Sequence, residues 1–86
     1  MAQIDFRKIG SDWVAFSDVV TLDADTTYRI YNRGPHVVLA AEADAIPTGQ
    51  AGVLVRPYET LVYKKGTQTL YLKAFGETYI NTTSEA

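Results

Sequence analysis

From residue 26 onward, glycine and proline divide the chain into short β-rich runs at near-regular spacing. The runs that predict strands are 26–33, 36–42, 52–56, 60–64, 69–75 and 77–83. Short strands separated by Gly- or Pro-containing turns are typical of compact antiparallel sheets. The sequence therefore predicts an all-β fold, a small jelly-roll-like antiparallel β-sandwich or barrel of about seven or eight short strands.

Alternation within the runs indicates which side chains face the core. In run 26–33, Tyr28, Ile30 and Asn32 share one face, and the residues between them share the other. A period of two is typical of a half-buried antiparallel strand. Residues 37–41 are instead continuously apolar, which predicts a central strand buried on both faces. The predicted core consists of Trp13, Tyr28, Ile30, Val38, Ala40, Leu54, Leu61, Leu70, Leu72 and Ile80.

The ends of the chain carry weaker patterns. Residues 1–11 read as an N-terminal arm or an edge strand, and residues 13–16 as a short strand. Residues 84–86 are expected to fray as a tail. With 86 residues in all, the chain is long enough for one domain, 1–86, and too short for two.

Composition argues against several classes of protein. The absence of cysteine excludes disulfides and Cys-based zinc sites. The net charge is −2 and the eight basic residues are scattered, so we expect no nucleic-acid binding. No segment reaches the ~20 apolar residues of a membrane span, and the N-terminus has no secretory signal. We therefore expect a soluble protein made in the cytoplasm.

Candidate catalytic and metal-binding residues are few. His36 is the only histidine and has no second His or Cys with which to share a metal. Asp23 and Asp25 resemble the start of a calcium loop, with Asp18 nearby, but the twelfth position is Gly34 instead of an acidic residue. The glycines form no phosphate-binding motif. We therefore predict no cofactor, no metal, no catalytic residues and no enzymatic activity, although spacing alone leaves paired carboxylates open.

Tyrosine is the most suggestive residue type for binding. Six tyrosines cannot all be buried in so small a domain, and tyrosine is enriched at protein interfaces. Tyr31 and Tyr71 alternate with predicted core positions and should face outward. Residues 43–51 form a long apolar-rich loop that either caps the core or contacts a partner. The predicted interface consists of Tyr31, Tyr71, Ala45, Ile46 and Pro47.

Residues 26–83 resemble small proteins encoded in the structural-gene regions of tailed phages and prophages. The resemblance consists of an aromatic strand ending in a Gly turn (28–34), a small-residue strand (37–43), Ile46-Pro47, a Gly-hydrophobic step with a Pro-x-Glu turn (52–60), and a closing strand (70–75). Such proteins often carry Gly after the Pro, where this chain has Tyr58.

The resemblance implies a virion structural protein, a capsid decoration or head–tail component made in the bacterial host cytoplasm. It implies virion proteins or further copies of the chain as partners, and no membrane. Two other functions stay open at this point. The first is a carbohydrate- or peptide-binding module that uses surface tyrosines, and the second, ranked lowest, is a small enzyme.

Overall fold

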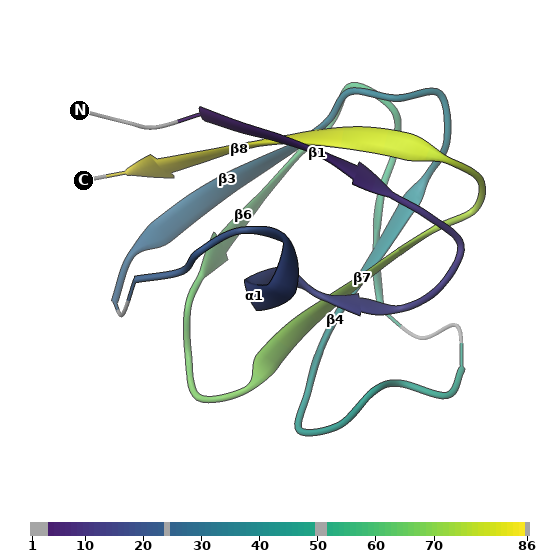
Figure 1. Ribbon diagram of the computed structural model, residues 1–86. Coiled ribbons are helices and arrows are strands. Elements are labelled where there is room, and N and C mark those ends of the chain that lie inside the picture. Colours follow the sequence, from purple (N-terminus) through teal and green to yellow (C-terminus); the bar gives the residue numbers. More distant parts are fainter. Residues whose placement is uncertain (1–3, 24, 50–51, 86) are drawn as a thin grey trace.

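Eight strands and one helical turn make up the computed structural model, which describes residues 4–23, 25–49 and 52–85 (Figure 1). The elements are β1 (Ile4–Ile9), β2 (Val14–Ala15), α1 (Phe16–Val19), β3 (Thr27–Asn32), β4 (Val38–Ala43), β5 (Val53–Val55), β6 (Thr60–Lys64), β7 (Thr69–Ala74) and β8 (Thr78–Glu85). The predicted all-β fold is confirmed. All six strands predicted after residue 25 are present, with bounds that differ from the prediction by at most two residues.

The strands form two four-stranded antiparallel sheets. Sheet A has the order β1-β8-β3-β6 and sheet B the order β2-β7-β4-β5. The pairs β1–β8, β2–β7, β3–β6 and β4–β5 are nested, as in one long hairpin that has been rolled into two layers. Eight strands paired in this way have jelly-roll topology. Because the roll alternates between layers, β5 and β6 become edge strands on the same side of the sandwich.

The core lies between the two sheets and contains most of the residues expected there. Tyr28, Ile30, Val38, Ala40, Leu70, Leu72 and Ile80 are each at most 4% exposed. Trp13 and Leu61 are only half-buried. The expectation for Leu54 is wrong, because it pairs with Leu39 on the outer face of sheet B and is 53% exposed. Its neighbour Val55 faces the core instead.

Strand β4 confirms the prediction of a central strand buried on both faces. It lies between β7 and β5, and Val38, Leu39 and Ala40 are each at most 3% exposed. Val38 and Ala40 belong to the core between the sheets, whereas Leu39 lies outside that cluster. Leu39 points to the outer face of sheet B, where its cross-strand neighbour is Lys73. Because Leu39 is only 1% exposed, this face of the sheet is also covered at this position.

A single helical turn replaces the end of the predicted strand 13–16. Strand β2 ends at Ala15, and Phe16 begins α1 with a fully buried ring. That ring meets Tyr28 and Tyr63 edge to face, with both centroid distances 6.1 Å. The turn is needed because the chain leaves sheet B after β2 and enters sheet A at β3. The Phe16 ring therefore fills the core at the point where the chain passes from sheet B to sheet A.

The two ends of the described chain lie in one ladder. β1 is an edge strand paired with β8 from Ile4↔Thr83 to Ile9↔Thr78. The prediction that residues 84–86 fray as a tail is wrong for Ser84 and Glu85. Both pair with β3, so β8 continues through Glu85. Ala86 lies outside the described residues.

The buried amide of Asn32 joins four segments. Its Nδ2 donates to the carbonyl oxygens of His36 at 2.7 Å and Val55 at 2.9 Å. Its Oδ1 accepts from the Gly34 N–H at 3.2 Å and the Thr78 hydroxyl at 3.0 Å. Gly34 must be glycine here, because a Cβ would overlap the Thr78 hydroxyl. The amide thus has all of its hydrogen-bonding groups paired inside the protein.

Truncation of Leu72 should distinguish the core from the outer face of sheet B. Leu72 is fully buried, so Leu72→Ala should lower the free energy of unfolding by ~2–5 kcal/mol through lost burial and a cavity. Leu54→Ala is the matched control and should change it by less than about 0.5 kcal/mol. Urea unfolding monitored by circular dichroism measures both values. Equal losses for the two variants would contradict the observed faces of sheet B.

Removal of the Asn32 amide should cost more than a typical polar substitution. Asn32→Ala leaves buried donors and acceptors unpaired, so we expect a loss of about 2–4 kcal/mol in the free energy of unfolding. Asn81→Ala is the control, since the Asn81 Oδ1 has no hydrogen-bond partner, and it should cost less than about 1 kcal/mol. Chemical denaturation of both variants provides the comparison. A loss for Asn32→Ala no larger than the control would show that the network is not stabilising.

Candidate functional site

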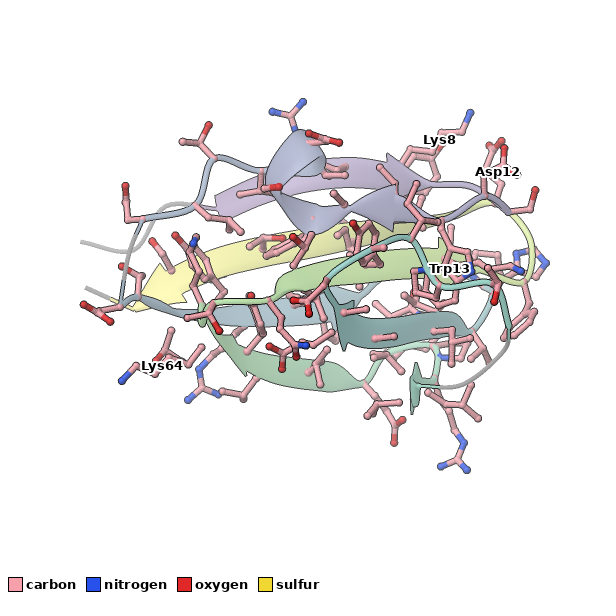
Figure 2. The ribbon with its side chains drawn as sticks, turned by 90° about the horizontal axis from the view of Figure 1, so that it is seen from below. Lys8, Asp12, Trp13 and Lys64 are labelled. Atoms are coloured by element: carbon pink, nitrogen blue, oxygen red, sulfur yellow. The ribbon has the colours of Figure 1, made fainter. Side chains whose placement is uncertain are left out.

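The two sides of the sandwich differ in how they are closed. On one side, α1 packs against β2 and β7, and its Phe16 ring fills the space between the layers. On the other side, the edge strands β5 and β6 have no helix or further described strand beside them. In Figure 2, β1 and α1 lie along one margin of the molecule and β6 lies along the opposite margin. We call the β5–β6 side the open side.

Two adjoining hollows lie between the layers on the open side. The outer one, of about 270 Å³, lies between β5 and the start of β6 and includes Val53, Leu54, Thr60 and Leu61 in its walls. The inner one, of about 110 Å³, shares Val53 and Leu61 and reaches the buried Leu70. The inner hollow is lined mainly by apolar atoms and the outer one mainly by polar atoms, and the two together form a cleft between the layers.

Exposed apolar side chains surround this cleft. Val53 is 58% exposed, Leu54 53% and Val62 56%. Tyr58, in the connection between β5 and β6, is 67% exposed. Four of the seven large hydrophobic side chains that are exposed among the described residues therefore lie on β5, on β6 or between them. Clustering of this kind marks a contact surface, whereas single exposed apolar residues are ordinary.

Strand β6 also presents unpaired backbone groups. Its ladder with β3 includes the bonds Asn32 N–H to Glu59 O, 3.0 Å, and Lys65 N–H to Thr26 O, 3.2 Å. In an antiparallel pair, bonded residues alternate with residues whose N–H and C=O point the other way. The odd-numbered residues of β6 therefore bond to β3. The N–H and C=O groups of Thr60, Val62 and Lys64 point to the free edge.

The turn between β5 and β6 holds Tyr58 in an unfavourable backbone conformation. Glu59 N–H donates to Arg56 O at 3.1 Å, Pro57 takes the second position and Tyr58 has φ +66°. This is a type II turn, whose third position usually holds Gly or Asn. A bulky residue at positive φ costs of order 1 kcal/mol or more, and such outliers cluster at functional sites. An exposed tyrosine in this conformation is a candidate contact residue.

Charged groups lie at the ends of the cleft. Glu59 lines the outer hollow, and its Oε1 accepts the Arg56 N–H at 3.1 Å. Glu42 lines the inner hollow beside the buried ring of Tyr63. Burial raises the pKa of the Tyr63 hydroxyl, and the negative charge of Glu42 raises this pKa further. The cleft therefore has an acidic side chain in each of its two hollows, Glu59 in the outer one and Glu42 in the inner one.

The sandwich separates the two tyrosines of the predicted interface. Tyr31 lies on β3 at an outward position of sheet A, and Tyr71 lies on β7 at an outward position of sheet B. Both rings are half-buried. In the β4–β5 connection, Ala45 and Ile46 are exposed and Pro47 is half-buried, while residues 50–51 of this loop lie outside the described residues. The five predicted residues are thus not brought into one surface.

The residues first considered for metal or acid–base chemistry have structural surroundings. His36 Nδ1 lies 2.9 Å from the Glu77 carbonyl oxygen. Its ring covers Gly76, which has φ +130° and where a Cβ would overlap the ring. Asp23 and Asp25 are exposed, and Asp23 donates its N–H to the Tyr28 hydroxyl at 2.6 Å. Within residues 4–23, 25–49 and 52–85, no three His, Asp or Glu residues are grouped to hold a metal ion.

Trp13 and Lys73 make a separate contact at one end of sheet B. Lys73 Nζ lies 5.7 Å from the centroid of the Trp13 ring, within the range of a cation–π interaction. Figure 2 shows Trp13, Asp12 and Lys8 at one end of the molecule and Lys64 at the other. Trp13, predicted as a core residue, is thus half-buried with the charged end of Lys73 over its ring.

Comparison with known protein families, curated proteins and solved structures finds no significant match to this chain. In the part of the chain that the structure describes, no helix has both the length and the apolar character of a membrane span.

Alkaline pH should reveal the environment of Tyr63. Because its pKa is raised above the ordinary 10.0, the unfolded chain releases the proton before the folded one does. The free energy of unfolding should therefore fall as pH rises above about 10. Tyr63→Phe removes this contribution and should make the loss between about pH 9 and pH 11 smaller than in the wild type. Glu42→Gln should give an intermediate loss, and a wild-type slope in Tyr63→Phe would contradict the assignment.

Proposed function

We propose that the chain is a non-enzymatic structural protein of a phage or prophage virion, a capsid decoration or head–tail component that acts through protein–protein contacts. The observation that carries the proposal is the open side, where a cleft, an unpaired strand edge and three exposed aliphatic residues lie along the two edge strands β5 and β6. A partner protein that contacts both edge strands would cover these features together.

Physical reasoning supports an assembled state. Removing apolar surface from water lowers the free energy by roughly 25 cal/mol per Å². A partner that covers Val53, Leu54 and Val62 therefore stabilises the complex. A domain of this size has a thin stability margin of its own. Binding to the folded state adds to its stability by mass action, which favours a small domain held on a large lattice.

The fold agrees with this role without being specific to it. Jelly rolls occur in viral capsid proteins and also in lectins. The resemblance of residues 26–83 to proteins from phage structural-gene regions favours the first of these settings. Because one fold hosts many functions, the open side supports the proposed role more directly than the fold does.

A peptide-binding module is the second candidate, and a specific observation favours it. The free edge of β6 adjoins the cleft, which is the arrangement that adds an extended peptide as a new strand. A carbohydrate platform on Tyr31 and Tyr71 is less favoured, because those rings lie on opposite faces of the sandwich. An array of extended peptides would detect the second function directly.

Particle composition tests the proposed function. We expect mass spectrometry of particles purified from the host that carries this gene to detect the chain in a fixed ratio to the other virion proteins. A double substitution, Val53→Ser with Leu54→Ser, should lower that ratio because it removes apolar contacts at the cleft. Phe75→Ser is the control, since Phe75 is 46% exposed but follows β7, away from the cleft residues.

The sequence-derived interface gives a second readout in the same particles. Tyr31→Ala and Tyr71→Ala should weaken association and leave the circular dichroism spectrum unchanged. Unfolding of these variants would instead place the two rings among the residues that stabilise the sandwich. Absence of the wild-type chain from the particles would refute the virion role.

A further inference from the structure

We propose that β6 pairs with β6 of a second copy, antiparallel about a twofold axis at Val62, so that sheet A continues through both molecules. The inference deepens the proposed function by naming one partner of the open side. It rests on that function only in requiring that the open side is a contact surface. Three independent features of β6 point to this pairing.

The first feature is that β6 is the least protected edge of the described sheets. β2 has two residues and β5 has three, which are too short for a stable ladder. β1 has six residues but carries Asp5, Arg7 and Lys8, and Lys8 Nζ pairs with Glu77 Oε2 at 3.0 Å. β6 carries a single charged residue, Lys64 at its last position, and its middle, Leu61-Val62-Tyr63, has no charge and no proline. Natural edge strands are usually protected by charged residues or proline.

The second feature is the hydrogen-bonding register. The groups at the free edge belong to Thr60, Val62 and Lys64, and an antiparallel partner must offer matching groups. When Val62 pairs with Val62 of the second copy, Thr60 pairs with Lys64 and Lys64 with Thr60. Every free group of β6 is then used, in about six main-chain hydrogen bonds. A shift of this axis to Leu61 or Tyr63 leaves some of these groups without a strand partner.

The third feature is charge complementarity in that same register. Glu59 precedes β6 and Lys65 follows it, so each Glu59 lies opposite Lys65 of the other copy. Opposite charges at directly facing positions stabilise an antiparallel pair, and like charges destabilise it. Each residue makes one backbone hydrogen bond to β3 or to the residue just before it, which holds Glu59 and Lys65 directly beside the two ends of β6. The acid-to-base order along β6 therefore suits an antiparallel copy of itself.

Side chains on both faces agree with this register. Val62 faces outward beside Arg29 and is 56% exposed, so two Val62 side chains would cover each other across the axis. On the inner face, half-buried Leu61 would lie opposite Tyr63 of the second copy. Leu61 also lines both hollows, so the partner strand would lie beside the cleft and cover part of it from water.

A second copy explains these features better than an unrelated strand does. An unrelated peptide needs only the backbone edge, whereas the match of Glu59 to Lys65 about a central Val62 is a property of β6 with itself. The net charge of −2 is small, so two copies approach without strong repulsion.

Charge reversal tests the register. Sedimentation velocity of the wild-type chain should show a dimer whose fraction rises with concentration. Glu59→Lys alone and Lys65→Glu alone should each weaken the dimer roughly fivefold, since each puts like charges opposite one another twice. An equimolar mixture of the two variants should restore a one-to-one dimer, because every facing pair is then opposite in charge. Native mass spectrometry identifies that mixed dimer, and failure of the mixture to associate would overturn the register.

A matched pair of exposed hydrophobic residues controls for unfolding and for nonspecific association. Val62→Lys should abolish the dimer, while Phe75→Lys, at a residue 46% exposed just after β7, should leave it unchanged. Circular dichroism should show both variants folded. Loss of the dimer in both would overturn the assignment to β6.

The outcomes separate this inference from the proposed function. A chain that is monomeric at all concentrations but present in particles would overturn β6 pairing and leave the virion role standing. A chain that forms the mixed dimer but is absent from particles would refute the virion role and support the pairing. Capture of unrelated extended peptides by the wild type, with no dimer, would assign the β6 edge to foreign strands.

Discussion

The buried amide of Asn32 is the interaction on which the arrangement of the open side depends. It lies in sheet A, and its bond to the Val55 carbonyl holds the end of β5, in sheet B, against the other layer. The backbone of the same residue bonds to Tyr58 and Glu59 in the turn that leads to β6. The two edge strands are therefore fixed together at the end where the cleft begins, since Val55 and Glu59 also line the outer hollow.

The strands after residue 25 could be predicted from the sequence because local signals agree there. Turn residues mark their ends and alternation marks their faces, as in β3, where Asn32 was correctly placed with Tyr28 and Ile30. Leu54 was misplaced because β5 has only three residues, which is too few for alternation to show which of them face inward. α1 was missed because a single turn of helix leaves no period in the sequence, and Phe16 alone carries its packing.

The candidate site was harder to predict than the fold, for a reason of topology. Whether Val62 is exposed depends on which strand lies beside β6. No local pattern in the sequence predicts the order of the strands in a sheet. The sequence predicts that Tyr31 and Tyr71 both face outward, but the outer faces of the two sheets point in opposite directions. The positive φ of Tyr58 had one signal in the sequence, namely that the residue stands where glycine is common after the proline.

The nested pairing of the strands also dictates the order in which the domain can form. β4 and β5 are neighbours along the chain, but β1 must wait for β8, since Ile4 lies opposite Thr83. Closing so long a loop lowers the entropy of the chain before any stabilising contact between β1 and β8 has formed. Folds dominated by contacts of this kind form slowly, in milliseconds to seconds. β1 leaves the ribosome before β8, the strand that pairs with it among the described residues. During synthesis β1 therefore stays without its ladder until β8 has been made, and the domain does not fold progressively from β1 onward.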